Sequence, residues 1–203
     1  FQPPEICVIR SEDDACALLE EARAEGVVGV DTEGTQVTPP VVVQMATRER
    51  VYVFVAADES GVRDKRAAAV MADATVVKAV FGAHEADTLA GLAAPQNLVD
   101  VEAYGPAMQF GYYKPRYSLA DFASQLAGQP LVKDNCGRDF GKMGTRAMFA
   151  RKGQKRDQAR LQKALEGMSE RLVNYAAADA WVTRIIYEHL QEGGMLKGGN
   201  DGG

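Results

Sequence analysis

The residues best suited to chemistry are carboxylates that lie at the ends of predicted strands and on a predicted helix. Asp31 and Glu33 are two residues apart at the end of an apolar run, so their side chains point to the same face of a strand. Asp87 follows a later apolar strand, and Asp179 stands four residues after Tyr175 in an alanine-rich helix, which makes those two neighbours on one helix face. Oxygen donors of this kind are the ligands that Mg²⁺ and Mn²⁺ prefer.

The sequence offers few residues that could form other kinds of catalytic or metal site. The chain has two histidines, His84 and His189, and three cysteines that form no CxxC pair. A zinc site, a disulfide framework or a Ser-His-Asp triad is therefore not indicated, and any metal would have to be held by carboxylates. Each acid taken alone also has an ordinary interpretation, as the start of a polar loop, a first-turn acid that complements a helix dipole, or an exposed residue on a packed helix.

The elements that position these acids follow from the apolar pattern. Four strands are expected in the first part of the chain, at residues 6–9, 27–30, 41–46 and 51–55. The connections between the last three are short, which indicates antiparallel pairing. A helix with a capping box at Ser11 and Asp14 and a buried stripe that runs from Ala15 to Ala22 separates the first two strands and ends at Gly26.

Strands then alternate with helices up to residue 101, which is typical of βαβ units and a parallel portion of sheet. From Ser118 onward the pattern is helical. Ser118 and Ser169 are predicted N-caps, the second for a long helix that ends at Glu192. We expect one mixed-sheet domain over residues 1–196 and a disordered, glycine-rich tail over residues 197–203.

Composition and charge narrow the class of protein. With 203 residues, 46% of them hydrophobic, most of the chain is too apolar to be disordered, and no apolar run reaches the roughly 20 residues of a membrane span.

The net charge is −5, yet residues 138–171 hold ten basic and four acidic residues. A basic segment on an acidic body indicates a polyanion partner; the alternatives are a solvated helical face, or docking on a protein partner or a further domain. Because the chain opens at Phe1, we expect a piece of a longer protein. Its three cysteines, which form no CxxC pair, favour a reducing intracellular compartment, with cytoplasm, nucleus and mitochondrion all open.

Taken together, the acidic motifs resemble the DEDD exonuclease superfamily, and the tyrosine in the last motif is typical of its DEDDy branch. The chain is most similar to ribonuclease D-like exoribonucleases. The resemblance rests on Val30-Asp31-Thr32-Glu33, residues 77–89, Leu98-Val99-Asp100, Ser118-Leu119-Ala120-Asp121, Leu131-Val132-Lys133 and residues 175–181. It implies an α/β fold of the ribonuclease H-like (DnaQ-like exonuclease) kind, with a mixed five-stranded sheet flanked by helices. A basic insertion at about residues 138–168 replaces the Trp and Arg-Pro-Leu segment that these proteins usually have.

The resemblance also implies roles for the site residues. Two Mg²⁺ or Mn²⁺ ions are expected, with Asp31 bridging both, Glu33 and Asp179 completing the first, and Asp87 holding the second through water. A tyrosine has a reference pKa of about 10, which is too high for an efficient base at neutral pH. The Tyr175 hydroxyl is therefore expected to orient the attacking water.

Substrate contacts are expected in three places. Glu33, Gly34 and Thr35 would lie beside the terminal sugar, while His84 would contact the scissile phosphate or face solvent. A predicted basic helix would contact the phosphate backbone through Lys152, Arg156 and Arg160, which share one face. A cluster of aromatic and basic residues could stack bases or simply form a loop at the domain edge; it comprises Tyr112, Tyr113, Lys114, Arg116 and Tyr117.

The function that follows from the resemblance is metal-dependent 3′–5′ hydrolysis of single-stranded RNA from a free 3′-OH, with release of 5′-mononucleotides. Two alternatives remain open. One is a 3′–5′ DNA exonuclease similar to the nuclease domain of the Werner helicase. The other is a non-catalytic RNA-binding adaptor on the same fold, against which the intact acids argue.

Overall fold

A computed structural model shows how the chain folds. It describes residues 3–9, 17–35, 38–55, 65–108, 110, 114–128, 131, 163 and 166–196. The predicted capping box at Ser11 and Asp14, the basic helix and the glycine-rich tail lie outside the described residues. In the described part of the chain, no helix is both long enough and apolar enough to cross a membrane.

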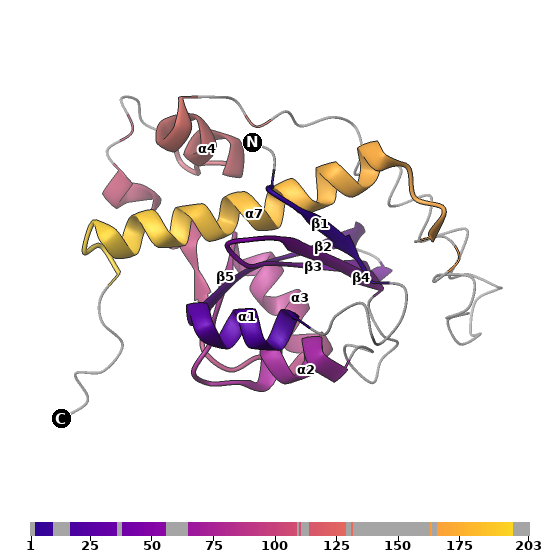
Figure 1. Ribbon diagram of the computed structural model, residues 1–203. Helices are drawn as coiled ribbons and strands as arrows, with labels where there is room; N and C mark the ends of the chain where they lie inside the picture. Colours follow the sequence, from indigo (N-terminus) through magenta and orange to yellow (C-terminus); the bar gives the residue numbers. More distant parts are fainter. Residues whose placement is uncertain are drawn as a thin grey trace.

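Six strands form one mixed sheet in the order β1-β4-β3-β2-β5-β6 (Figure 1). They are β1 (Ile6–Val8), β2 (Val27–Thr35), β3 (Thr38–Ala46), β4 (Val51–Val55), β5 (Val77–Val80) and β6 (Leu98–Asp100). The central strands β2, β3 and β4 are antiparallel neighbours, whereas β5 runs parallel to β2 and β6 parallel to β5. The predicted mixed sheet is confirmed, with its antiparallel meander and its parallel half.

The resemblance implied five strands, whereas the sheet has six. The strand at its edge is β1, which the apolar pattern predicted at residues 6–9 and which pairs in parallel with β4 from Ile6 opposite Val51 to Val8 opposite Val53. This short apolar segment completes the sheet because its side chains pack on the same apolar layers as the longer strands.

Helices cover both faces of the sheet (Figure 1). One face carries α1 (Leu18–Glu25), α2 (Lys65–Ala72) and α3 (Ala83–Ala93), which bury apolar side chains such as Leu18, Val70 and Leu89. The other carries α4 (Leu119–Ala127) and the long α7 (Glu170–Glu192), with the 3₁₀ helix η2 (Val101–Met108) following β6.

The two serine caps are confirmed. Ser118 forms a capping box at the start of α4: its hydroxyl accepts a hydrogen bond from the Asp121 backbone N–H at 3.3 Å, and the Asp121 carboxylate accepts one from the Ser118 N–H at 2.7 Å. Ser169 accepts a hydrogen bond from the Leu172 N–H at 3.4 Å, which fixes the first turn of α7.

Helix α7 lies directly against β2 at Gly29. A Cβ atom at this position would lie 2.2 Å from the Ala180 carbonyl oxygen and 2.8 Å from the Arg184 backbone nitrogen. The missing side chain therefore permits an unusually close approach of helix to strand. Arg184 itself, 1% exposed, pairs with Glu25 at 2.8 Å and with Glu188 at 3.0 Å, which ties α7 to the end of α1.

Candidate metal centre

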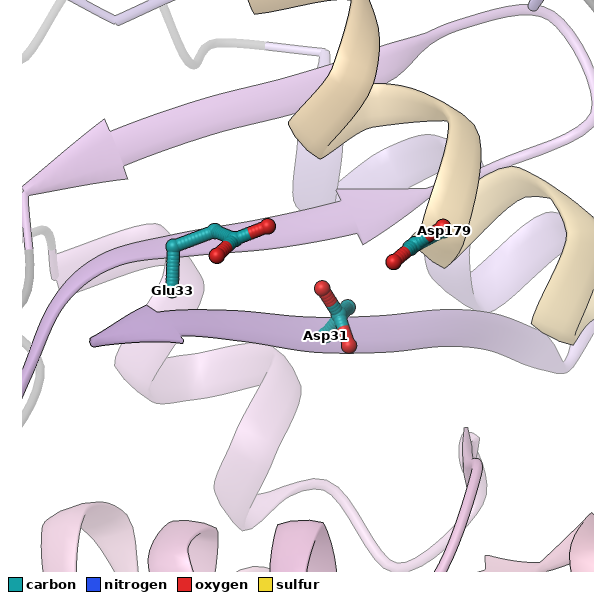
Figure 2. A group of neighbouring side chains, drawn as sticks. All are labelled: Asp31, Glu33 and Asp179. Carbon is teal, nitrogen blue, oxygen red and sulfur yellow. The ribbon is translucent and has the colours of Figure 1, made fainter. Parts of the chain in front are cut away.

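Three carboxylates meet where α7 crosses the end of β2 (Figure 2). Asp31 and Glu33 rise from one face of β2, and Asp179 comes from α7 above it. Each offers an oxygen, and these three oxygens all lie within 4.8 Å of one another. Among the described residues, this is the group of acids and other metal-ligating side chains that is close enough to share an ion.

The burial and close spacing of these acids favour the binding of a cation. Glu33 is 8% exposed, Asp179 is 6% exposed, and Asp31 is half-buried. Carboxylates at such short range in a poorly solvated site repel one another unless a positive charge lies between them. Because the donors are all oxygens, the site fits a hard divalent ion such as Mg²⁺ or Mn²⁺.

Strand pairing explains why the end of β2 can carry these charges. The pairing of β2 with β5 ends at Gly29 opposite Ala79, whereas its pairing with β3 continues to Glu33 opposite Val42. The register then shifts between Glu33 and Thr35. Asp31 and Glu33 therefore stand on the part of β2 that projects beyond its parallel neighbour, at the carboxyl end of the parallel half of the sheet.

Tyr175 lies on α7 one turn before Asp179 and is half-buried. It packs beside Ala176 and Ala180, which are fully buried against β3 and β4. The small side chains let this end of α7 lie close to the sheet, and the i, i+4 spacing places the tyrosine on the same side of the helix as Asp179.

The remaining predicted site residues are not in this group. Asp87 and His84 both lie on α3, and both are exposed. Gly34 and Thr35 are the last two residues of β2, directly after Glu33, and the Thr35 side chain is outside the described part. Lys152, Arg156 and Arg160 fall outside the described residues and their contacts stay predictions.

Glu85, which was not among the residues predicted from the sequence, lies in the first turn of α3 two residues before Asp87. Burial raises the pKa of its carboxyl group to about 7; hydrogen bonds from the Thr32 hydroxyl and backbone N–H lower this pKa, and the charge of Asp179 raises it. Its Oε1 atom is buried and has no hydrogen-bond partner among the described residues. Glu85 thus joins α3 to the strand segment between Asp31 and Glu33.

Gln44 was also missed. It lies on β3 directly opposite Asp31 and is fully buried. Neither its side-chain oxygen nor its nitrogen has a hydrogen-bond partner among the described residues. The one sequence signal was a polar residue inside the apolar run Val41-Val42-Val43-Gln44-Met45-Ala46.

The described part of the aromatic and basic cluster forms internal contacts. Tyr117 stacks on Phe110 with ring centroids 4.0 Å apart, and Lys114 pairs with Asp121 at 2.6 Å. Arg116 pairs with Glu102, with Nη2 2.8 Å from Oε2. These contacts favour the interpretation as a structural loop at the domain edge over a base-stacking surface.

The sheet order, the helices on both faces and the acidic group at the end of β2 define the ribonuclease H-like class of α/β fold, in its DnaQ-like exonuclease form. A comparison with protein families matches residues 6–194 to the 3′–5′ exonuclease family. Because the match spans nearly the whole sequence, the chain belongs to the 3′–5′ exonuclease family.

Solved structures share the fold at low sequence identity. RNase D of Escherichia coli, an exoribonuclease involved in structured RNA processing, superposes with a TM-score of 0.62 at 18% identity over 93% of this chain and 46% of that one. The Nibbler EXO domain of Aedes aegypti gives a TM-score of 0.62 at 15% identity over 93% of this chain and 88% of that domain. RNase D of Trypanosoma brucei gives a TM-score of 0.64 at 14% identity over 98% and 66%. The chain thus spans about half the length of the bacterial RNase D. A comparison with curated protein sequences found no match.

Proposed function

We propose that the protein is a metal-dependent 3′–5′ exoribonuclease that removes 5′-mononucleotides from single-stranded RNA. The observation that carries the proposal is the group formed by Asp31, Glu33 and Asp179, with oxygens within 4.8 Å, in a chain of the 3′–5′ exonuclease family. RNA as the substrate is supported by the likeness in fold to the ribonuclease D structures, one of which is a complex with RNA U12.

Two bound Mg²⁺ or Mn²⁺ ions would stabilise charge on the attacking and leaving oxygens and would make the attacking water more acidic. Asp31, Glu33 and Asp179 would hold the ions directly. Asp87, exposed on α3, would reach the second ion through water. The Tyr175 hydroxyl would orient the attacking water, because its ordinary pKa is too high for it to serve as a base.

The test is digestion of matched 5′-labelled RNA and DNA oligonucleotides with Mg²⁺, Mn²⁺ or EDTA. We expect a ladder that shortens from the 3′ end, faster on RNA, and abolished by EDTA. Faster digestion of DNA would show that the same site belongs to a 3′–5′ DNA exonuclease. Tight RNA binding without any cleavage would instead make the chain a binding adaptor.

The 3′ end itself gives a second prediction. Glu33 is expected to accept a hydrogen bond from the terminal 3′-OH, so a 3′-phosphorylated RNA should be degraded at least about 100-fold more slowly than the same RNA with a free hydroxyl. Removing the phosphate with a phosphatase should restore the rate. Cleavage of a circular RNA as fast as a linear one would contradict this, since it would identify an endonuclease.

The fourth carboxylate gives a third prediction, because Asp87 and Glu85 differ in their surroundings. Asp87→Asn should lower the rate by about 10- to 100-fold, as expected for a ligand that acts through water, and a higher Mg²⁺ concentration should recover part of the loss. Its thermal midpoint should not change, since Asp87 is exposed. If Asp87→Asn keeps full activity and Glu85→Gln loses most of it, then Glu85, and not Asp87, is the fourth carboxylate of the metal centre.

A further inference from the structure

We propose that Gln44 is a positioning residue for this reaction, whose side-chain amide holds the Asp31 carboxylate in the orientation that the metal centre needs. The inference rests on the proposed function, because it assigns a partner to the acid expected to bridge the two ions. Gln44 was not among the predicted site residues, and it reaches the site through Asp31.

The register of the sheet places the two side chains together. Gln44 on β3 is the direct partner of Asp31 on β2 in an antiparallel pair. Residues directly opposite in such a pair project to the same face, with Cβ atoms about 5 Å apart. The amide of Gln44 and the carboxylate of Asp31 therefore share the face that α7 covers.

The other neighbours of Gln44 on this face are apolar. Val42 and Ala46 flank it along β3, and Val53 is its partner on β4. All three are fully buried, and they belong to the same apolar cluster as the alanines of α7. Of the residues directly beside Gln44 on this face of the sheet, Asp31 is the one that offers a polar side chain, and Glu33 is a diagonal neighbour.

The energetics argue against a purely structural amide. Gln44 is fully buried, and both of its side-chain polar atoms lack a hydrogen-bond partner among the described residues. A buried amide in this state destabilises a fold, whereas an apolar side chain of similar size at the same position would not. The Gln44 amide destabilises the fold but lies beside the Asp31 carboxylate. Its presence is explained if its NH₂ group donates a hydrogen bond to Asp31 when the metal centre is assembled. A neutral donor orients a carboxylate without competing as a cation for the site.

The experiment compares Gln44→Met with the wild-type protein by thermal unfolding without metal and by Mn²⁺ titration calorimetry. We expect the thermal midpoint to stay equal or rise, while the Mn²⁺ dissociation constant increases about 10- to 100-fold, as for other groups that orient a metal ligand. Gln44→Leu serves as a second apolar variant, with a branched side chain of about the same volume as methionine. Met45→Leu is the matched control, because Met45 is also fully buried but faces the opposite apolar layer, and its Mn²⁺ affinity should be unchanged.

The outcomes separate this inference from the proposed function. If the wild-type protein binds Mn²⁺ and Gln44→Met binds it equally well, the positioning role is wrong while the metal centre stands. A fall in thermal midpoint that accompanies the lost affinity would also overturn it, since the amide would then be structural. If the wild-type protein itself binds no Mn²⁺, the proposed function fails first.

Discussion

Replacing Asp31 by asparagine is expected to lower the rate of RNA hydrolysis by about a thousandfold or more, which corresponds to about 4 kcal/mol of transition-state stabilisation. Asp31 stands on the same strand as Glu33 and faces Asp179 on α7 (Figure 2), so under the proposed function it would hold the ions together with these two acids. The substitution keeps the size of the side chain and removes one of three mutually repelling charges. The thermal midpoint should therefore stay the same or rise.

The measurement is the single-turnover rate with saturating Mg²⁺, together with a thermal unfolding curve. Glu5→Gln is a suitable control, because it also exchanges an acid for an amide but lies at an exposed position that pairs with Arg50 at 3.7 Å. Its rate should match that of the wild-type protein. An Asp31→Asn variant that keeps a tenth of the wild-type rate would contradict the two-metal account.

Replacing Gly29 by alanine should destabilise the protein by about 3 kcal/mol and lower the rate of hydrolysis by about 100-fold. The added Cβ would overlap the Ala180 carbonyl oxygen, 2.2 Å away, which belongs to the helix backbone and cannot rotate aside. Helix α7 would have to move away from β2, and Asp179 would move with it. Both losses should therefore appear together, in the free energy of unfolding in urea and in the rate.

Gly193→Ala is the matched control for this prediction. Gly193 caps α7 with a φ of −75°. A Cβ there would meet the flexible end of the Met195 side chain at 2.7 Å, and its nearest backbone atom, the His189 carbonyl oxygen, would be 3.3 Å away. This change should alter stability by less than about 0.5 kcal/mol. A Gly29→Ala variant as stable and as active as this control would show that α7 does not lie on β2 as described.

Much of this architecture could be predicted because it depends on local sequence. The two-residue spacing of Asp31 and Glu33 fixes a common face, and short connections fix the antiparallel order of β2, β3 and β4. Ser118 and Ser169 mark helix starts because a hydroxyl at the N-cap satisfies a free backbone N–H.

What could not be predicted depends on contacts between distant segments. In the sequence, Gly29 only interrupts an apolar strand. The reason for a glycine there, the close contact with α7, depends on the tertiary packing. The role proposed for Gln44 depends on the strand register, which places it opposite Asp31. Glu85 resembles an ordinary first-turn acid, and its burial against Thr32 follows only from the way α3 meets the end of β2. In each case the local pattern permits several partners, and the tertiary packing selects one.

A crystal structure of the protein soaked in Mn²⁺, with the ions located by their anomalous scattering, tests most directly whether the three carboxylates form a metal centre. We expect two manganese peaks at the end of β2, one of them coordinated by Asp31, Glu33 and Asp179 together. In crystals of Asp31→Asn, both peaks should weaken or disappear. Manganese bound elsewhere on the protein, with none between these three carboxylates, would contradict the assignment of this group as the metal centre.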